Sequence, residues 1–193
     1  MKILTSISLA ICFGQILPIS AKIHDNLGPP MHGEVIFNIL KSNNQLQVLI
    51  KASSMDILGF ENPPRTTEQI NRFIRSLDSF KNTQQLFSLP QHAKCELINQ
   101  RLVHSSTPND KNLPSQNYEV YEAISQINRG QINHHSRFTV HYQFNCEAME
   151  YLTQMFIHWF EPFPLSNTVN VHMANSNGQK SQQSYRGNPL IRF

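Results

Sequence analysis

The chain has 193 residues, of which 39% are apolar and only 15% are charged. Sixteen lysines and arginines against thirteen aspartates and glutamates leave a net charge of +3, too small an excess for the basic face of a nucleic-acid-binding protein. The composition also excludes a coiled coil, a collagen-like chain and a polytopic membrane protein. Nine histidines are its unusual feature.

The first 21 residues are typical of a secretory signal peptide. A positive start, Met1-Lys2, precedes a mostly apolar run over residues 3–19, and Ala21 is the small residue that signal peptidase requires. Cys12 raises the alternative of a lipoprotein, but the residue before it is not small. We predict cleavage near Ala21, export, and one mature domain over residues 22–193.

The mature chain opens with a predicted β-hairpin. Apolar and polar residues alternate from Gly33 to Ile39 and again from Leu46 to Ile50. Residues 41–44 between them are turn-forming, since asparagine tolerates positive φ.

A helix is the next predicted element, after an irregular apolar segment at residues 53–61. Thr66 and Gln69 form a capping-box pattern. Apolar residues at helical spacing follow as far as Leu77, with charged residues on the opposite face.

Alternation predicts further strands in the rest of the chain, with a short helical turn at residues 147–153. The strands are expected at residues 95–103, 137–144, 168–173 and 189–193, with an aromatic strand around residues 156–160. Residues 105–133 are polar and hold little that could be buried, so we predict a flexible insertion there. The expected fold class is α+β, a single domain of mainly antiparallel strands with one clear helix.

Two cysteines remain after the signal peptide, Cys95 and Cys146. Exported proteins retain disulfides, and closing this loop would stabilise the fold by about 4 kcal/mol in the chain-entropy model. The alternatives are a thiolate metal site and a nucleophile, but no Cys-x-x-Cys motif or neighbouring base supports either. We predict a disulfide.

Several short phrases occur in a fixed order along the mature chain: His32-Gly33, residues 53–61, residues 86–90 with Cys95, Tyr142-x-Phe144-x-Cys146, residues 160–164, residues 177–179 and residues 188–190. Their combination resembles the ZrgA family, exported proteins associated with zinc uptake in Gram-negative bacteria. The resemblance implies a periplasmic protein that binds zinc and helps zinc acquisition. It also implies a divalent metal ion and a membrane zinc transporter as partners.

The sequence departs from that family at two places. Family members usually carry a His- and acid-rich insertion between the two cysteine-bearing strands, and often a His-x-His-Gly start. Here Pro30 stands where the earlier histidine would be, and residues 105–133 contain no histidine. Recruitment of zinc by a flexible polyhistidine loop is therefore largely lost.

A zinc site on the scaffold is still predicted. One histidine begins the first strand, another ends the third, and a pair begins the fourth, so three strand ends could present imidazoles at one edge of a sheet. Zinc takes three or four nitrogen, oxygen or sulfur ligands in a tetrahedral arrangement. The predicted ligands are His32, His104, His134 and His135, with Asp110, Glu119 or Glu122 as a further ligand.

Three alternatives stand beside this prediction. Asn, Gln and His are frequent polar choices throughout the chain, so the edge histidines can also arise without a binding role. Catalysis is not expected, because no Gly-x-Ser-x-Gly elbow, His-Glu-x-x-His helix or Gly-rich phosphate loop is present. Asp56 and Glu61 flank Gly59, but carboxylates at a turn more often cap backbone amides. Finally, the same scaffold could be an interaction module without metal, a reading that exposure of Trp159 would favour over core packing.

Overall fold

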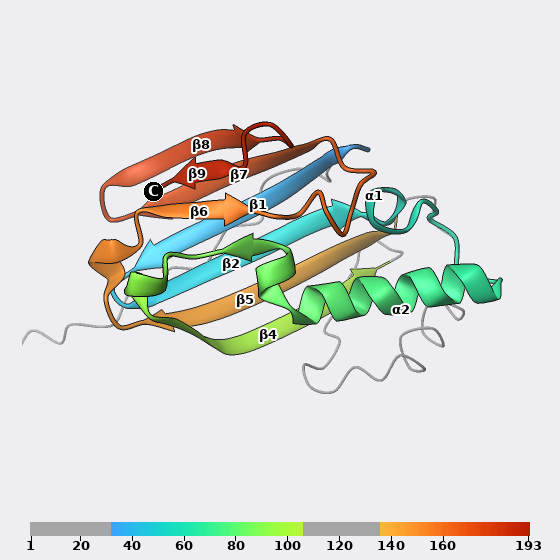
Figure 1. Ribbon diagram of the computed structural model, residues 1–193, viewed down its shortest axis with the longest axis horizontal. Helices are drawn as coiled ribbons and strands as arrows, with labels where there is room; N and C mark the ends of the chain where they lie inside the picture. Colours follow the sequence, from blue (N-terminus) through green and yellow to red (C-terminus); the bar gives the residue numbers. More distant parts are fainter. Residues whose placement is uncertain (1–31, 106–135) are drawn as a thin grey trace, which may run out of the picture.

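A six-stranded sheet forms one layer of the protein (Figure 1). The computed structural model describes residues 32–105 and 136–193. Neighbouring strands of the sheet run in the order β4-β5-β2-β1-β7-β8. Their bounds are β1 (Glu34–Ser42), β2 (Gln45–Ser53), β4 (Cys95–Ser105), β5 (Arg137–Cys146), β7 (Thr168–Asn175) and β8 (Gly178–Ser184).

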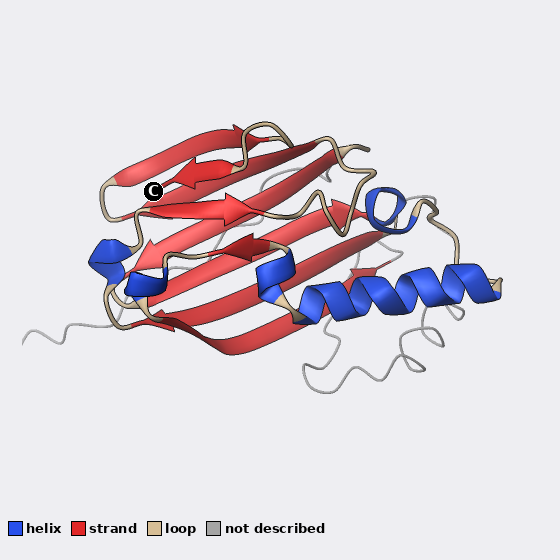
Figure 2. Ribbon diagram, in the orientation of Figure 1, coloured by secondary structure: helices blue, strands red, loops and turns tan. Residues whose placement is uncertain are grey.

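The second layer covers one face of this sheet with a helix and a small three-stranded sheet (Figure 2). The small sheet has the order β3-β6-β9. The elements of this layer are α1 (Ser54–Leu58), α2 (Thr67–Lys81), β3 (Phe87–Ser88), β6 (Gln154–Ile157) and β9 (Leu190–Arg192), with 3₁₀ turns η1 (Thr83–Gln85), η2 (Gln91–Ala93) and η3 (Met149–Tyr151). Among the described residues, none of the helices has the length and apolar character needed to cross a membrane.

Aromatic side chains fill the space between the layers. Phe37 on β1 meets Trp159 edge to face at 5.6 Å between ring centroids, and Phe80 on α2 lies 5.3 Å from Phe138 on β5. Trp159 is fully buried and its indole N–H donates to Ser166 Oγ at 3.0 Å. The exposure that would have favoured an interaction surface at Trp159 is therefore not found, and this ring belongs to the core.

The α+β class, the hairpin and the capped helix are confirmed. The hairpin turns at Asn43, whose φ of 50° is the left-handed conformation that asparagine tolerates. Thr66 Oγ1 accepts the amide of Gln69, and the Gln69 side chain accepts the amide of Thr66 in return. One pairing departs from the antiparallel pattern, because β1 and β7 run parallel.

The predicted disulfide is also confirmed. Cys95 begins β4 and Cys146 ends β5, directly opposite each other across the two strands. Their sulfur atoms are 2.05 Å apart. The bond ties the edge strand β4 to its neighbour at the end of the sheet where the chain leaves β5.

Some elements were not predicted from the sequence. Residues 53–61, expected to be irregular, contain helix α1, and strands β3 and β8 lie where no strand was predicted. The predicted aromatic strand ends at Ile157, because the chain then turns so that Trp159 and Phe160 both enter the core. The signal peptide and nearly all of the predicted insertion lie outside the described residues, so the domain boundaries remain predictions.

Candidate metal site at the end of the sheet

Four strand ends meet at one edge of the six-stranded sheet. Since β1, β2, β5 and β4 pair in that order in antiparallel fashion, the start of β1, the end of β2, the start of β5 and the end of β4 share this edge. His32 lies beside the start of β1 and His104 near the end of β4, so both are at this end of the sheet, and their role as zinc ligands stays a prediction. His134 and His135 lie outside the described residues and stay predicted ligands, as do Asp110, Glu119 and Glu122.

A glycine turn fixes the backbone next to His32. Gly33 has a φ of +83°, a conformation that side chains disfavour, and a Cβ there would lie 3.0 Å from Asn167 Nδ2. The Gly33 amide donates to Asp56 Oδ1 at 2.7 Å, while its carbonyl accepts from the amides of Asn167 and Thr168 at 2.9 and 3.1 Å. The backbone next to His32 is therefore fixed by hydrogen bonds at this end of the sheet.

Helix α1 brings a serine and a glutamate to the same place. Ser53 is its N-cap, and Ser53 Oγ accepts the amide of Met55 at 3.0 Å. The same oxygen lies 3.2 Å from His32 Nδ1. The helix ends at Gly59, whose φ of 78° turns the chain toward Glu61.

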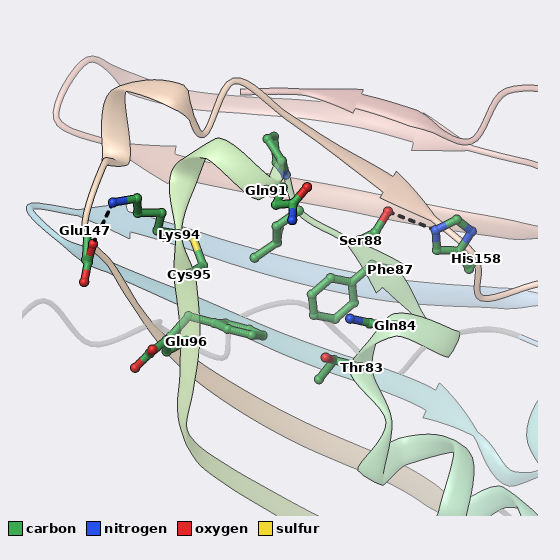
Figure 3. Close-up of a pocket in the computed structure, with 13 residues that line it drawn as sticks. Thr83, Gln84, Phe87, Ser88, Gln91, Lys94, Cys95, Glu96, Glu147 and His158 are labelled. Atoms are coloured by element: carbon green, nitrogen blue, oxygen red, sulfur yellow. Dashed lines mark hydrogen bonds and ion pairs between the residues drawn. The ribbon is translucent and has the colours of Figure 1, made fainter.

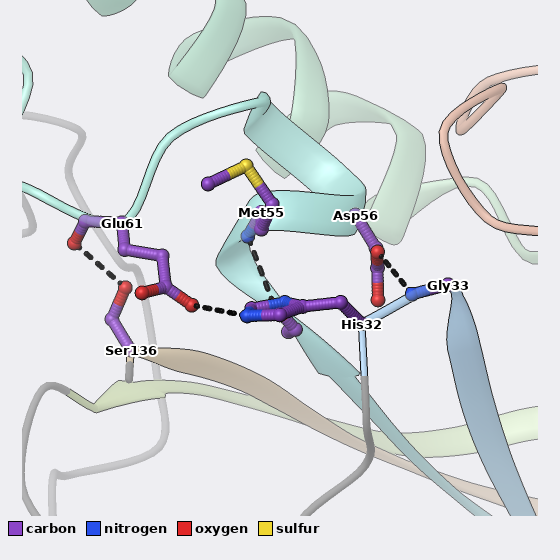
Figure 4. Close-up of polar contacts among 7 residues, drawn as sticks. His32, Gly33, Met55, Asp56, Glu61 and Ser136 are labelled. Atoms are coloured by element: carbon purple, nitrogen blue, oxygen red, sulfur yellow. Dashed lines mark hydrogen bonds and ion pairs between the residues drawn. The ribbon is translucent and has the colours of Figure 1, made fainter. Parts of the chain in front are cut away.

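The imidazole of His32 faces the carboxylate of Glu61 (Figure 4). His32 Nε2 and Glu61 Oε1 are 3.7 Å apart, with the histidine side chain 55% exposed and the glutamate side chain 15% exposed. The Ser136 hydroxyl donates to the carbonyl of Glu61 at 2.9 Å and ties this residue to the start of β5. The histidine of the pair is thus open to solvent, whereas the glutamate is mostly shielded and its backbone is fixed by Ser136.

A second carboxylate, that of Asp56, lies near this pair and contacts the backbone of Gly33. Asp56 is 3% exposed, and its Oδ2 makes no hydrogen bond with the described residues. Burial raises the pKa of Asp56, although the Gly33 amide and the His32 imidazole act in the opposite direction. A buried carboxylate oxygen without a partner is costly, and a cation bound nearby would offset that cost.

The donor set suits zinc but is incomplete by itself. Imidazole nitrogen and carboxylate oxygen are both common zinc ligands. Within residues 32–105 and 136–193, however, no three His, Cys, Asp or Glu side chains converge closely enough to hold a metal ion. His32 and Glu61 can therefore provide two ligands, with Asp56 as a nearby negative charge.

His104 lies in a different environment from His32. Its ring packs against Phe138 and Phe73, at 4.5 and 5.7 Å between centroids, on the core face of the sheet. Its Nε2 is 2.9 Å from Ser54 Oγ, and its shielded Nδ1 has no hydrogen-bond partner in the described part of the chain. Burial lowers the pKa of His104 to about 4, so the ring is neutral near pH 7. A ligand role for His104 stays a prediction, and the described contacts of its ring are those of a core residue.

Sequence reasoning considered Asp56 and Glu61 only as turn carboxylates. For Asp56 that reading holds in part, since its Oδ1 does accept the backbone amide of Gly33. Their position in the chain could have connected them with His32. Both residues come after β2, and the hairpin partner of β2 is β1, which begins beside His32. The pairing of His32 with Glu61 follows only once α1 and the turn at Gly59 are known.

A groove between β3 and the start of β4 is the other concave surface of interest (Figure 3). It has a volume of about 800 Å³, and Phe87, Phe144 and Cys95 contribute to its lining. At one end Lys94 and Glu147 form an ion pair at 3.3 Å, and at the other His158 Nε2 lies 3.0 Å from Ser88 Oγ. Glu147 and His158 therefore lie at opposite ends of the groove, each with a protein partner, and the end of the large sheet remains the candidate site.

Comparison with known proteins connects the chain with zinc. A family model described as ZrgA family zinc uptake protein matches residues 29–193. The match includes His32, Asp56 and Glu61 and extends to the last residue of the chain. No curated protein matches the chain.

Proposed function

Because the chain belongs to the ZrgA family of zinc uptake proteins, we propose that it is a periplasmic protein that binds zinc and assists its acquisition. Zinc is the cargo in this proposal, and the protein holds it for a membrane zinc transporter. The role assigned is binding rather than catalysis. The candidate site at the end of the sheet supplies the first two ligands, His32 and Glu61.

The separation of these two side chains carries the proposal. At 3.7 Å, His32 Nε2 and Glu61 Oε1 are too far apart for a good hydrogen bond. Two ligands on one tetrahedral zinc ion, with bonds of about 2.0–2.2 Å, lie about 3.4 Å from each other. A zinc ion fits between these atoms after a shift of a few tenths of an ångström in flexible side chains.

The surroundings favour a cation that is captured and released rather than permanently enclosed. Two carboxylates, Asp56 and Glu61, give the site a negative potential, while the exposed His32 leaves the ion accessible to solvent. Water or a partner protein can complete the coordination. His134 and His135 remain the predicted ligands from this chain.

Zinc titration by calorimetry tests the proposal. The unaltered protein is expected to bind zinc, and His32→Ala and Glu61→Gln are each expected to weaken the affinity at least about tenfold, because each removes one ligand. His172→Ala is the matched control, since this histidine lies on β7 with its Nδ1 2.9 Å from Ser181 Oγ. A separate His134→Ala/His135→Ala variant tests the two predicted ligands independently.

Two results would contradict the assignment. Zinc affinity that is unchanged in both His32→Ala and Glu61→Gln would remove the proposed site. No heat from the unaltered protein at micromolar zinc would remove zinc binding altogether, and an interaction module without metal would then be the remaining function on this scaffold.

The location is tested separately from the metal. If residues 1–21 direct export, the protein recovered from the periplasm should have a mass that corresponds to cleavage near Ala21. An uncleaved chain retained in the cytoplasm would contradict the periplasmic role, whatever its zinc affinity.

A further inference from the structure

The hydroxyl of Ser53 lies where the helix cap and the candidate site meet. Ser53 is 5% exposed and ends β2. Its Oγ accepts the amide of Met55 at 3.0 Å and lies 3.2 Å from His32 Nδ1. One buried oxygen therefore contacts both the start of α1 and the imidazole that faces Glu61.

The Met55 contact leaves the hydroxyl one acceptor site and its O–H donor for His32. A serine hydroxyl has two acceptor sites and one donor, and the Met55 amide uses one acceptor site. If His32 carries its proton on Nδ1, that N–H donates to the second acceptor site of Ser53. The lone pair of Nε2 is then directed toward Glu61, on the side where a metal would bind.

Metal binding requires this tautomer. A histidine that binds zinc through Nε2 carries its proton on Nδ1, and the oxygen that accepts this proton fixes the ring orientation. Glu61 is an acceptor only, so without a cation it favours a proton on Nε2 instead. Ser53 Oγ, 3.2 Å from Nδ1, can accept the Nδ1 proton and stabilise the zinc-binding form.

We propose that Ser53 is a positioning residue for zinc, which accepts the Nδ1–H of zinc-bound His32 and so keeps Nε2 directed toward Glu61. This inference rests on the proposed zinc-binding function. It predicts that removal of a single oxygen atom outside the coordination sphere weakens zinc binding.

The neighbouring residue provides a matched control. Ser54 also contacts an imidazole, with its Oγ 2.9 Å from His104 Nε2, but that ring is packed in the core. Ser53→Ala and Ser54→Ala each remove one hydroxyl from adjacent positions. Only the first of them removes a contact of the ring that faces Glu61.

The loss of the helix cap needs a control of its own, because Ser53→Ala also removes the N-cap of α1. Thr66→Ala removes the equivalent cap from α2, where Thr66 Oγ1 accepts the amide of Gln69. Loss of an N-cap serine or threonine typically costs about 0.5–2 kcal/mol, so an effect of general destabilisation would appear in both variants.

The experiment measures zinc affinity in this set of variants and the tautomer of His32 in the zinc-bound protein. Ser53→Ala is expected to weaken zinc binding about tenfold, as loss of such an outer contact typically does, while Ser53→Thr restores it to within about threefold. Ser54→Ala and Thr66→Ala should bind zinc like the unaltered protein. Nitrogen-15 NMR of the His32 ring should show a proton on Nδ1 in the zinc-bound protein.

Two results would overturn the inference while leaving the proposed function in place. They are zinc affinity unchanged in Ser53→Ala although His32→Ala weakens it, and failure of Ser53→Thr to restore binding in a variant that folds normally by circular dichroism. Absence of zinc binding by the unaltered protein would instead overturn the proposed function and this inference with it.

Discussion

Two histidines at the same end of the sheet, His32 and His104, have opposite environments. Adjacent serines contact them: Ser53, the last residue of β2, at Nδ1 of His32, and Ser54, the first residue of α1, at Nε2 of His104. His32 is 55% exposed and faces a carboxylate, whereas His104 packs against Phe73 and Phe138.

The difference shows that two imidazoles at strand ends can offer a cation very different surroundings. At His104 a bound dication would have to be desolvated among aromatic rings, which is costly without a paired charge. At His32 solvent and two carboxylates stabilise positive charge. We therefore expect changes at His104 to alter stability and changes at His32 to alter zinc binding.

The largest expected effect is on stability in His104→Ala. Removal of a ring that is packed between aromatic side chains should lower the free energy of unfolding by about 3 kcal/mol, because it leaves a cavity and takes the partner of Ser54 away. Urea denaturation measures this loss. His32→Ala, in which an exposed side chain is shortened, should stay within about 0.5 kcal/mol of the unaltered protein, and equal losses in the two variants would break the comparison.

The pH dependence of stability is the next largest effect. His104 has a pKa of about 4 in the folded protein against 6.5 for an unperturbed histidine, so below pH 6.5 the unfolded chain binds a proton that the folded protein does not. The contribution is complete above pH 6.5 and is lost as the pH falls toward 4. Between pH 6.5 and about pH 5 the expected loss is about 1.5 kcal/mol.

His104→Phe isolates that contribution, because phenylalanine fills a similar space and does not titrate. The difference in unfolding free energy between the unaltered protein and this variant should change with pH over this interval. A constant difference would mean that His104 titrates normally in the folded protein.

Stabilisation of the protein by zinc should depend on His32 and not on His104. A ligand that binds only the folded state raises the melting temperature, and the rise shrinks as affinity falls. The rise measured by differential scanning fluorimetry should be smaller in His32→Ala than in the unaltered protein. The expected tenfold or greater loss of zinc affinity corresponds to about 1.4 kcal/mol or more of binding free energy. His104→Phe should keep the full rise, and its loss there would make His104 part of the zinc site.

The smallest effect is expected for Ser54→Ala. This change removes the hydrogen bond to His104 Nε2 and should cost about 1 kcal/mol in the free energy of unfolding. A double-mutant cycle with His104→Phe checks the cause, because Ser54→Ala should cost much less once the ring nitrogen is absent. An equal cost in both backgrounds would assign the loss to another contact of Ser54.

Local sequence patterns predicted the elements that local chemistry controls. The hairpin follows from alternation around Asn43, and the start of α2 follows from Thr66 and Gln69, because these patterns act within a few residues. The two cysteines left after the predicted signal peptide were enough to predict the disulfide between Cys95 and Cys146. Helix α1 and strand β3 were missed because they are too short to show a period, and they depend on capping by Ser53 and on pairing with β6.

The candidate site, too, could be predicted from the sequence only in part. The sequence alone placed His32 and His104 at strand ends, because strand boundaries and strand parity can be read from hydrophobic periodicity. Which histidine is exposed and which packs against aromatic rings was decided by the tertiary structure, since α2 and its Phe73 cover the face of the sheet on which His104 lies.

Composition determined that this is a polar, folded chain with a small net charge and many imidazoles. It could not determine which of those imidazoles meets a carboxylate. The meeting of His32 with Glu61 required the turn at Gly33, the cap at Ser53 and the turn at Gly59 to bring together residues 29 positions apart in the sequence. Contacts of this kind depend on the packed fold, because no local pattern links side chains so far apart along the chain.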